Sequence, residues 1–329
     1  MTTLITGASG FLGGRIAQLL SAQGEDIIVL ARPTSALTHL ANVPHRLVEG
    51  DLSDPASLQR AVTEATRIIH CAACSTDWAP WQTYYGANVT GTQNLVDAVL
   101  RSDKIERFVH ISTTDVYGYP PAPCDESTLT RDAGLPYNQT KRLGELAVWK
   151  AHQDHGLPVT ILRPATIYGP RGKDFTVEIA TLLRQRLMAT IDHGGAPGGF
   201  AYVDNVAEAI LQASTHPATI GEAFNLADGT EANWATYLKL YAEALGTKPP
   251  WINLSLTAAT ALARILELPH RLLRLPGRPL LTRHAVLLLA LNQEFPAVKA
   301  KETFGFSPKV SLEEGIARSA AWLSDKTNV

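Results

Sequence analysis

Thr6-Gly7-Ala8-Ser9-Gly10-Phe11-Leu12-Gly13 follows directly after the apolar residues 4–6 and determines how the rest of the chain is interpreted. Three glycines spaced three residues apart permit a tight turn, a close approach of the backbone to phosphate, and close packing of the next helix. Residues 11–23 have the pattern of an amphipathic helix, whose free N–H groups and positive dipole end would face the phosphates. Because the glycines lie between a strand and a helix, the stretch predicts a dinucleotide-binding loop. The expected contacts are Gly7, Ser9, Gly10, Phe11, Leu12 and Gly13.

Short β-branched runs alternate with helical patterns on both sides of this loop. The alternation predicts an α/β fold, a Rossmann-type doubly wound parallel sheet with a smaller, mostly helical C-terminal substrate domain. We expect a dinucleotide-binding domain over residues 1–170, to which residues 200–226 return, and a substrate-binding domain over residues 171–329. The expected strands are 4–6, 26–31, 45–48, 67–70, 107–112 and 159–162, with late strands at 200–203 and 223–226, and the expected helices include 11–23, 88–101 and 137–155.

Composition excludes several classes of protein. The 329 residues include 29 basic and 31 acidic side chains, a net charge of −2, and 45% are apolar. No Lys/Arg block is present, so we expect no nucleic-acid partner. Only three cysteines indicate a reducing, cytoplasmic location. No signal peptide is visible at the N-terminus, and the apolar stretch 251–268 is interrupted by Arg264 and Glu267, so no membrane span is expected. The expected partner is a small molecule, with a homodimer as a candidate assembly.

The end of the second predicted strand bears on the choice of cofactor. It reads Leu30-Ala31-Arg32-Pro33-Thr34-Ser35, where an NAD-binding protein would place a carboxylate for the ribose hydroxyls. A guanidinium with nearby hydroxyls suits a 2′-phosphate, so NADP is favoured. In the alternative, Arg32 is a solvated surface charge and NAD binds.

Two further stretches suggest proton-transfer chemistry. Tyr137-Asn138-Gln139-Thr140-Lys141 places a phenol and an ammonium group on one face of a helix. A neighbouring cation favours the phenolate and would lower the pKa of Tyr137 toward neutrality. The alternative is an ordinary amphipathic helix surface. Upstream, His110-Ile111-Ser112-Thr113-Thr114-Asp115 reads as a strand that ends in hydroxyl groups.

Together these motifs resemble the short-chain dehydrogenase/reductase superfamily. Leu162-Arg163-Pro164-Ala165-Thr166-Ile167-Tyr168-Gly169-Pro170 narrows the resemblance to its extended branch, the NAD-dependent epimerase/dehydratase fold family. The Arg-Pro form is similar to the 3β-hydroxysteroid dehydrogenase and dihydroflavonol reductase groups. Recognisable motifs span residues 3 to about 230.

The resemblance implies a role for each matching residue. Tyr137 would transfer the proton, Lys141 would hold the nicotinamide ribose, and Thr113 would hold the substrate oxygen. Asp51 is similar to the acid that contacts adenine in the family, although it could equally cap the helix that starts near Pro55. The remaining cofactor contacts implied are Leu52, Cys71, Ala72, Ala73, Pro164 and Thr166.

The same resemblance implies an NAD(P)-dependent oxidoreductase that interconverts a ketone and a secondary alcohol. Its expected substrate is apolar: steroid-like, 3-oxoacyl or polyketide-like. Thr166 stands where many nucleotide-sugar members carry a phosphate-gripping Asn, and the single acid Asp115 disfavours dehydration. Leucine-rich residues 252–291 would form a pocket or a plain helical core. The rival is a nucleotide-sugar epimerase with tightly bound NAD, which needs a cationic grip on a diphosphate, for which the chain offers Arg184, Arg186 and Arg274.

Several other signals suggest structural roles. Cys71 and Cys74 have metal-ligand spacing but lack a second pair, so no metal is expected. Asp204 is expected to cap a helix. The aromatic cluster Trp78, Trp81, Tyr84 and Tyr85 would belong to the core or wall the substrate pocket.

Overall fold

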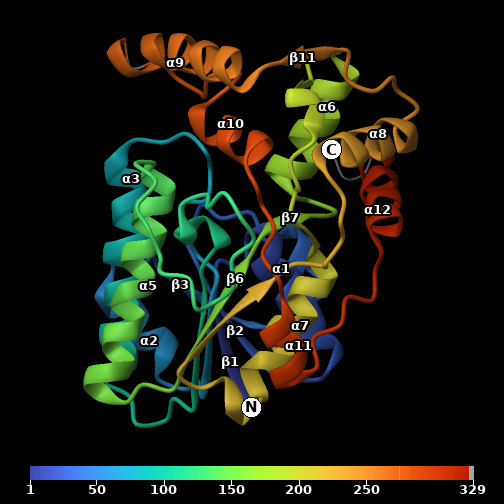
Figure 1. Cartoon of the computed structure of the whole chain (residues 1–329). Helices are drawn as coiled ribbons and strands as arrows, with labels where there is room; N and C mark the ends of the chain where they lie inside the picture. Colours follow the sequence, from blue (N-terminus) through green and yellow to red (C-terminus); the bar gives the residue numbers. More distant parts are fainter. Residues whose placement is uncertain (274, 326–329) are drawn as a thin grey trace.

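Seven parallel strands form the centre of the molecule. The computed structural model describes residues 1–273 and 275–325, and its main sheet has the strand order β10-β6-β5-β4-β1-β2-β3 (Figure 1). This is the doubly wound α/β architecture that the sequence predicts. The strands of this sheet are β1 (Thr2–Thr6), β2 (Asp26–Ala31), β3 (Arg46–Glu49), β4 (Arg67–His70), β5 (Arg107–Ile111), β6 (Val159–Pro164) and β10 (Glu222–Leu226).

Helices cover both faces of the sheet because its strands are apolar on both sides. Along β1, Leu4 packs with α2, α4 and α5 on one face, and Ile5 packs with α1 and α7 on the other. The helices are α1 (Phe11–Ala22), α2 (Pro55–Val62), α3 (Trp81–Tyr85), α4 (Gly91–Val99), α5 (Pro136–His155), α6 (Ile179–Arg184), α7 (Val203–Thr215), α8 (Trp234–Ala244), α9 (Leu256–Leu272), α10 (Arg283–Ala290), α11 (Val298–Phe304) and α12 (Leu312–Ser324). Short 3₁₀ or π helices are η1 (Thr38–Leu40), η2 (Gly86–Thr90), η3 (Thr114–Tyr117), η4 (Lys173–Glu178), η5 (Asp192–Gly194) and η6 (Pro217–Thr219).

The two late strands that the sequence predicts, at 200–203 and 223–226, join different sheets. β10 joins the edge of the main sheet beside β6, as expected. The run at 200–203 was expected to do the same, but β9 (Phe200–Tyr202) pairs with β7 (Thr166–Tyr168) in a separate sheet. The reason is packing: the ring of Phe200 stacks on Tyr237 with centroids 4.2 Å apart, in an aromatic core outside the main sheet. A third small sheet joins β8 (Ala189–Ile191) to β11 (Ile252–Leu254).

The phosphate loop requires its glycines for two separate reasons. Gly7 has φ +75°, and a Cβ there would lie 2.6 Å from the amide nitrogen of Ala72. A Cβ on Gly13 would lie 2.4 Å from the carbonyl oxygen of Gly7. The loop can therefore turn against β4, and α1 can pack against the loop, only without side chains at these positions.

No helix in the described ranges has the length and apolar character needed to cross a bilayer. In Figure 1, α6, α9, α10 and β11 lie together above the carboxyl ends of the main strands. These are the ends at which ligands bind in open α/β sheets.

Candidate active site

One cavity of about 1140 Å³ lies at the carboxyl ends of the strands, a size at the upper end of small-molecule sites. All of the residues predicted from the sequence to bind cofactor or take part in catalysis line it. They are Gly7, Ser9, Gly10, Phe11, Leu12, Gly13, Arg32, Asp51, Leu52, Cys71, Ala72, Ala73, Thr113, Tyr137, Lys141, Pro164 and Thr166.

The N-terminus of α1 opens into this cavity. Its N-cap residue Gly10 has no side chain to bond the first N–H groups of the helix. An uncapped helix N-terminus in a glycine cradle fits a dinucleotide pyrophosphate.

Two polar residues lie at the adenine end expected for such a cofactor. Arg32 follows β2, is exposed, and makes no ion pair with any described residue. Asp51 accepts hydrogen bonds from the amide and the hydroxyl of Ser53, at 2.9 and 2.7 Å, which lower the pKa of its carboxyl group. Asp51 does not cap α2, since Asp54 does so by accepting from the amide of Ala56.

The loop after β4 is held by an asparagine from the next helical segment. Asn88 in η2 accepts from the amide of Cys74 at 2.8 Å and donates to its carbonyl at 3.1 Å. Cys71 and Cys74 are free thiols, and burial raises the pKa of Cys71 to about 12. Among the described residues no group of His, Cys, Asp and Glu side chains is arranged to hold a metal ion. The loop therefore presents backbone and small side chains to the cavity.

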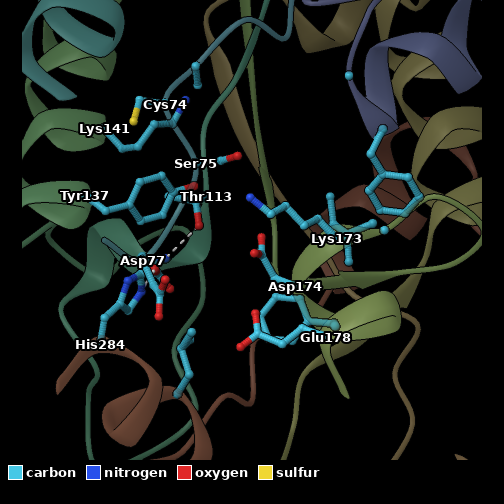
Figure 2. Close-up of a pocket in the computed structure, with 18 of the residues that line it drawn as sticks. Cys74, Ser75, Asp77, Thr113, Tyr137, Lys141, Lys173, Asp174, Glu178 and His284 are labelled. Atoms are coloured by element: carbon cyan, nitrogen blue, oxygen red, sulfur yellow. Dashed lines mark hydrogen bonds and ion pairs between the residues drawn. The ribbon is translucent and has the colours of Figure 1, made fainter. Parts of the chain in front are cut away.

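Thr113, Tyr137 and Lys141 meet where β5 ends beside α5 (Figure 2). The ammonium group of Lys141 donates to the carbonyl oxygen of Ile111 at 2.6 Å, and burial lowers the pKa of Lys141 to about 8. The expected lowering of the pKa of Tyr137 by this cation is wrong for the described structure. Burial, followed by the charge of Asp115, raises the pKa of Tyr137, and a hydrogen bond with Thr113 only partly opposes that rise.

A histidine that the sequence did not suggest lies against Tyr137. His284 on α10 stacks on the Tyr137 ring with centroids 5.5 Å apart, and its Nε2 lies 3.0 Å from Oδ2 of Asp115. Both members of this pair are buried and line the cavity. The C-terminal region thus contributes a histidine to the cavity beside Tyr137. Its long separation from Asp115 in the sequence leaves no motif that could have revealed it.

Acidic side chains face Tyr137 from across the cavity. Figure 2 shows Lys173, Asp174 and Glu178 on the wall opposite Tyr137 and His284. Arg278 lies between Glu178 and Asp77, 3.2 Å from the latter, and forms an ion pair with each. Burial raises the pKa of Asp174. The guanidinium on this wall is therefore already neutralised by protein carboxylates.

The rest of the cavity is apolar, and the leucine-rich segment supplies much of that lining. It also serves as a helical core, since Ala259 and Ala263 of α9 pack against Val286 of α10. The large apolar side chains that line the cavity include Leu182, Leu187, Met188, Ile191, Ile252, Leu254, Leu262, Leu266, Leu280, Leu281, Leu288 and Leu289.

The aromatic cluster does not wall the cavity: none of its four members lines it. Tyr84 is buried and packs beside Tyr137 with ring centroids 6.5 Å apart, whereas Trp81 and Tyr85 are partly exposed. Their neighbours Asp77, Gln82 and Thr83 form that part of the lining instead.

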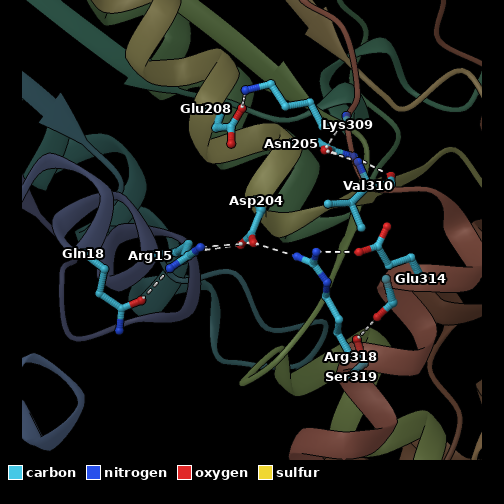
Figure 3. Close-up of polar contacts among 11 residues, drawn as sticks. Arg15, Gln18, Asp204, Asn205, Glu208, Lys309, Val310, Glu314, Arg318 and Ser319 are labelled. Carbon is cyan, nitrogen blue, oxygen red and sulfur yellow. Dashed lines mark hydrogen bonds and ion pairs between the residues drawn. The ribbon is translucent and has the colours of Figure 1, made fainter. Parts of the chain in front are cut away.

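Asp204 does not cap α7 as expected. Figure 3 shows its carboxylate between two arginines, with Oδ1 2.7 Å from Nε of Arg15 on α1 and Oδ2 3.5 Å from a guanidinium nitrogen of Arg318 on α12. The N-cap position of α7 belongs to Tyr202, which makes no side-chain cap.

Comparison with known proteins assigns the class. Residues 3–227 match the model of the NAD dependent epimerase/dehydratase family. The chain is 29% identical to 2-alkyl-3-oxoalkanoate reductase of Stenotrophomonas maltophilia (strain K279a), over 98% of this chain and 99% of that protein. It is 30% identical to 3beta-hydroxysteroid-dehydrogenase/decarboxylase isoform 1 of Arabidopsis thaliana, over 83% of this chain and 65% of that protein.

The solved structures agree on the fold. The crystal structure of UDP-glucuronic acid 4-epimerase from Bacillus cereus with NAD has a TM-score of 0.79 at 23% identity, covering 98% of this chain and 96% of that one. The chain belongs to the NAD-dependent epimerase/dehydratase family, which confirms the resemblance to extended short-chain dehydrogenases/reductases. It is an NAD(P)-dependent enzyme of that superfamily, an oxidoreductase.

Proposed function

We propose that this enzyme reduces a ketone on an apolar substrate to the secondary alcohol, with NADPH as the reductant. The observation that carries the proposal is the apolar part of the cavity lining, which is supplied mainly by leucine and isoleucine side chains. Such a surface binds hydrocarbon by removing it from water, at about 25 cal/mol per Å². The relative from Stenotrophomonas maltophilia, named as a reductase of 2-alkyl-3-oxoalkanoates, is consistent with this substrate class.

The chemistry follows from the groups that surround the reacting carbonyl. The bound nicotinamide nucleotide supplies the hydride that reaches the carbonyl carbon. Tyr137 donates its phenolic proton to the carbonyl oxygen, which becomes the alcohol, and Thr113 donates a hydrogen bond that orients that oxygen. The phenolate left on Tyr137 then recovers its proton from solvent. Lys141 provides a buried positive charge one helical turn further along α5.

Arg32 supports NADP over NAD as the cofactor. Its guanidinium is exposed at the cavity, carries no ion pair with a described residue, and has Ser35 nearby on the same lining. A 2′-phosphate would supply the missing partner, with charge-assisted hydrogen bonds. If Arg32 stays solvated instead, the same cradle accepts NAD.

The rival function, epimerisation of a nucleotide sugar, has less support. Of the arginines considered for gripping a diphosphate, Arg184 and Arg186 are not part of the cavity lining, and Arg274 lies outside the described residues. Arg278 does line the cavity, but Asp77 and Glu178 neutralise it. A diphosphate would also approach the carboxyl group of Asp174.

A titration tests the proposal directly. NADPH oxidation is followed with a series of alkyl and polycyclic ketones, and the binding of one UDP-sugar is titrated, each at low and high salt. We expect KM to fall about fourfold, or about 0.8 kcal/mol, for each buried CH₂, with little response to salt. Tight, salt-sensitive binding of the UDP-sugar alone, with NAD retained through purification, would establish the epimerase instead.

A further inference from the structure

The outer side of α9 and the chain after it carry a concentrated apolar surface. We call it the α9 surface, and its members are exposed by between 39% and 72%: Leu262, Ile265, Leu268, Leu272, Leu273, Leu275 and Leu280. Large contiguous apolar areas are uncommon on soluble proteins and mark interaction sites. Figure 1 shows α9 at the edge of the molecule farthest from the main strands, with α10 on its inner side.

The core does not account for these side chains. The inner face of α9 includes the small residues Ala259 and Ala263, which pack against Val286 of α10, and Leu266, which lines the cavity. Glu267 on that face is buried and bonds both the amide and the guanidinium of Arg283 at 2.8 Å. These contacts hold α9 in place, so Ile265, Leu268 and Leu272 are left for a contact outside the chain.

Basic residues predominate in the sequence of the α9 surface. Residues 251–283 contain five arginines, and Glu267, which is buried, is their single acidic residue. Arg271 and Arg283 pair with Glu267, and Arg278 pairs with Asp77 and Glu178. Arg264 is exposed beside Ile265 and forms no ion pair with a described residue, so it places an unpaired positive charge beside the apolar side chains. The segment is basic within a chain whose net charge is −2. An amphipathic helix with leucines and arginines on its exposed side suits an anionic lipid surface.

The cavity is continuous with the same surface. Leu262 and Leu280 belong to the α9 surface and also line the cavity, and Leu187 on another segment of the lining is 47% exposed. These three leucines therefore contribute both to the outer surface and to the cavity lining. An apolar molecule could pass from a hydrocarbon phase into the cavity along leucine side chains, without crossing water.

We propose that the α9 surface docks on an anionic lipid membrane, from which the enzyme takes up its apolar ketone. The proposal rests on the proposed function for the identity of the cargo, but the docking itself requires no turnover. It commits to lipid because the exposed charge is positive and because apolar side chains are shared between the surface and the cavity. A second copy of the chain is the competing occupant.

Vesicle flotation tests the docking without substrate or cofactor. The full chain is mixed with vesicles of phosphatidylcholine, or of phosphatidylcholine with phosphatidylglycerol, at low and high salt. The variant Ile265→Glu/Leu272→Glu changes two residues that do not line the cavity. The matched control is Leu129→Glu, which changes a leucine that is 80% exposed elsewhere on the molecule. Light scattering gives the molar mass of each protein without vesicles, and thermal unfolding confirms that each is folded.

We expect wild type and Leu129→Glu to float with anionic vesicles, less so at high salt, and the double variant to bind at least fivefold more weakly. The double variant should keep its turnover of a short, soluble ketone. Failure of wild type to bind anionic vesicles, or equal binding of the double variant, would overturn the proposal. Equal binding to both kinds of vesicle would overturn the anionic assignment. A wild-type dimer that the double variant dissociates would show that a second copy covers this surface. If the vesicle results hold but no ketone is reduced, the proposed function fails and the docking stands.

Discussion

Tyr137 is the residue on which the proposed proton transfer depends. Replacing it with Phe removes one oxygen and leaves the ring to stack on His284. Turnover should fall by ~10² to 10⁴, the usual contribution of a positioned acid, whereas cofactor affinity should hardly change. Steady-state kinetics and cofactor titration measure the two effects separately. Tyr84→Phe is the control, because it removes a hydroxyl from the neighbouring ring, which does not line the cavity. Near-normal turnover in Tyr137→Phe would require another proton donor.

Arg32 determines the expected cofactor preference. Arg32→Asp should weaken NADPH far more than NADH, by ~1.5 to 3 kcal/mol, because a charge-assisted contact is replaced by repulsion. Dissociation constants for both nucleotides give the ratio. Arg46→Asp, which alters another exposed arginine on the next strand, should leave the ratio alone. An unchanged preference in Arg32→Asp would mean that Arg32 is only a surface charge.

Asp228 gives stability a dependence on pH. Its carboxylate accepts from the amide of Tyr202 at 2.7 Å, and burial raises its pKa to about 7. The folded state therefore holds a proton between pH 4 and 7 that the unfolded state has lost, so this carboxyl contributes stability at low pH that is lost as pH rises through 7.

The side chain in Asp228→Asn cannot ionise, so this variant should not lose stability as pH rises through 7. The free energy of unfolding of Asp228→Asn minus that of wild type should be more positive at pH 8 than at pH 5, as measured by urea unfolding at each pH. Asp103→Asn, in an exposed loop, should show no such difference. If Asp228→Asn and wild type differ in free energy of unfolding by the same amount at pH 5 and pH 8, the raised pKa of Asp228 is contradicted.

At the scale of elements, what could be predicted follows from burial. β2 and β4 coincide with the expected residues 26–31 and 67–70, because central parallel strands are buried on both faces and carry adjacent β-branched residues, here Ile27 to Val29 and Ile68 to Ile69. β7, β8 and β11 are each three residues long and pair only with distant segments, so no local sequence pattern predicts them as strands. The run at 200–203 has the composition of a strand, but composition cannot say which sheet it joins.

The same limit applies to the site. Residues that follow strand ends in sequence motifs could be predicted, as Thr113 and Ala72 illustrate. His284 and Asp174 reach the cavity only through the packing of the C-terminal region, and no spacing along the chain encodes that contact. The pKa of Tyr137 likewise depends on how deeply packing buries it, which the spacing of Tyr137 and Lys141 alone does not convey.

For the whole molecule, Asp204 connects regions far apart in sequence. Its ion pairs join α1 and α12 to α7 (Figure 3). Because Asp204 is 17% exposed, Asp204→Ala should lower the free energy of unfolding by about 1 to 2 kcal/mol, less at high salt. Glu208 is on the same helix as Asp204 and forms a more exposed ion pair with Lys309. Glu208→Ala removes that pair and should have little effect on the free energy of unfolding. Equal losses in the two variants, measured by denaturant unfolding, would show that Asp204 is an ordinary surface charge.

The position of β10 at the edge of the main sheet has a consequence for synthesis. β6 ends at Pro164, but its outer neighbour begins only at Glu222, so one edge of the sheet stays unpaired while the intervening chain is made. Strands that are far apart in the sequence pair late and slowly during folding. Until they pair, the unpaired edge strand can associate with other chains. A nascent chain released before Leu226 would expose that edge. The ribosome and its chaperones, rather than the finished fold, must then shield it.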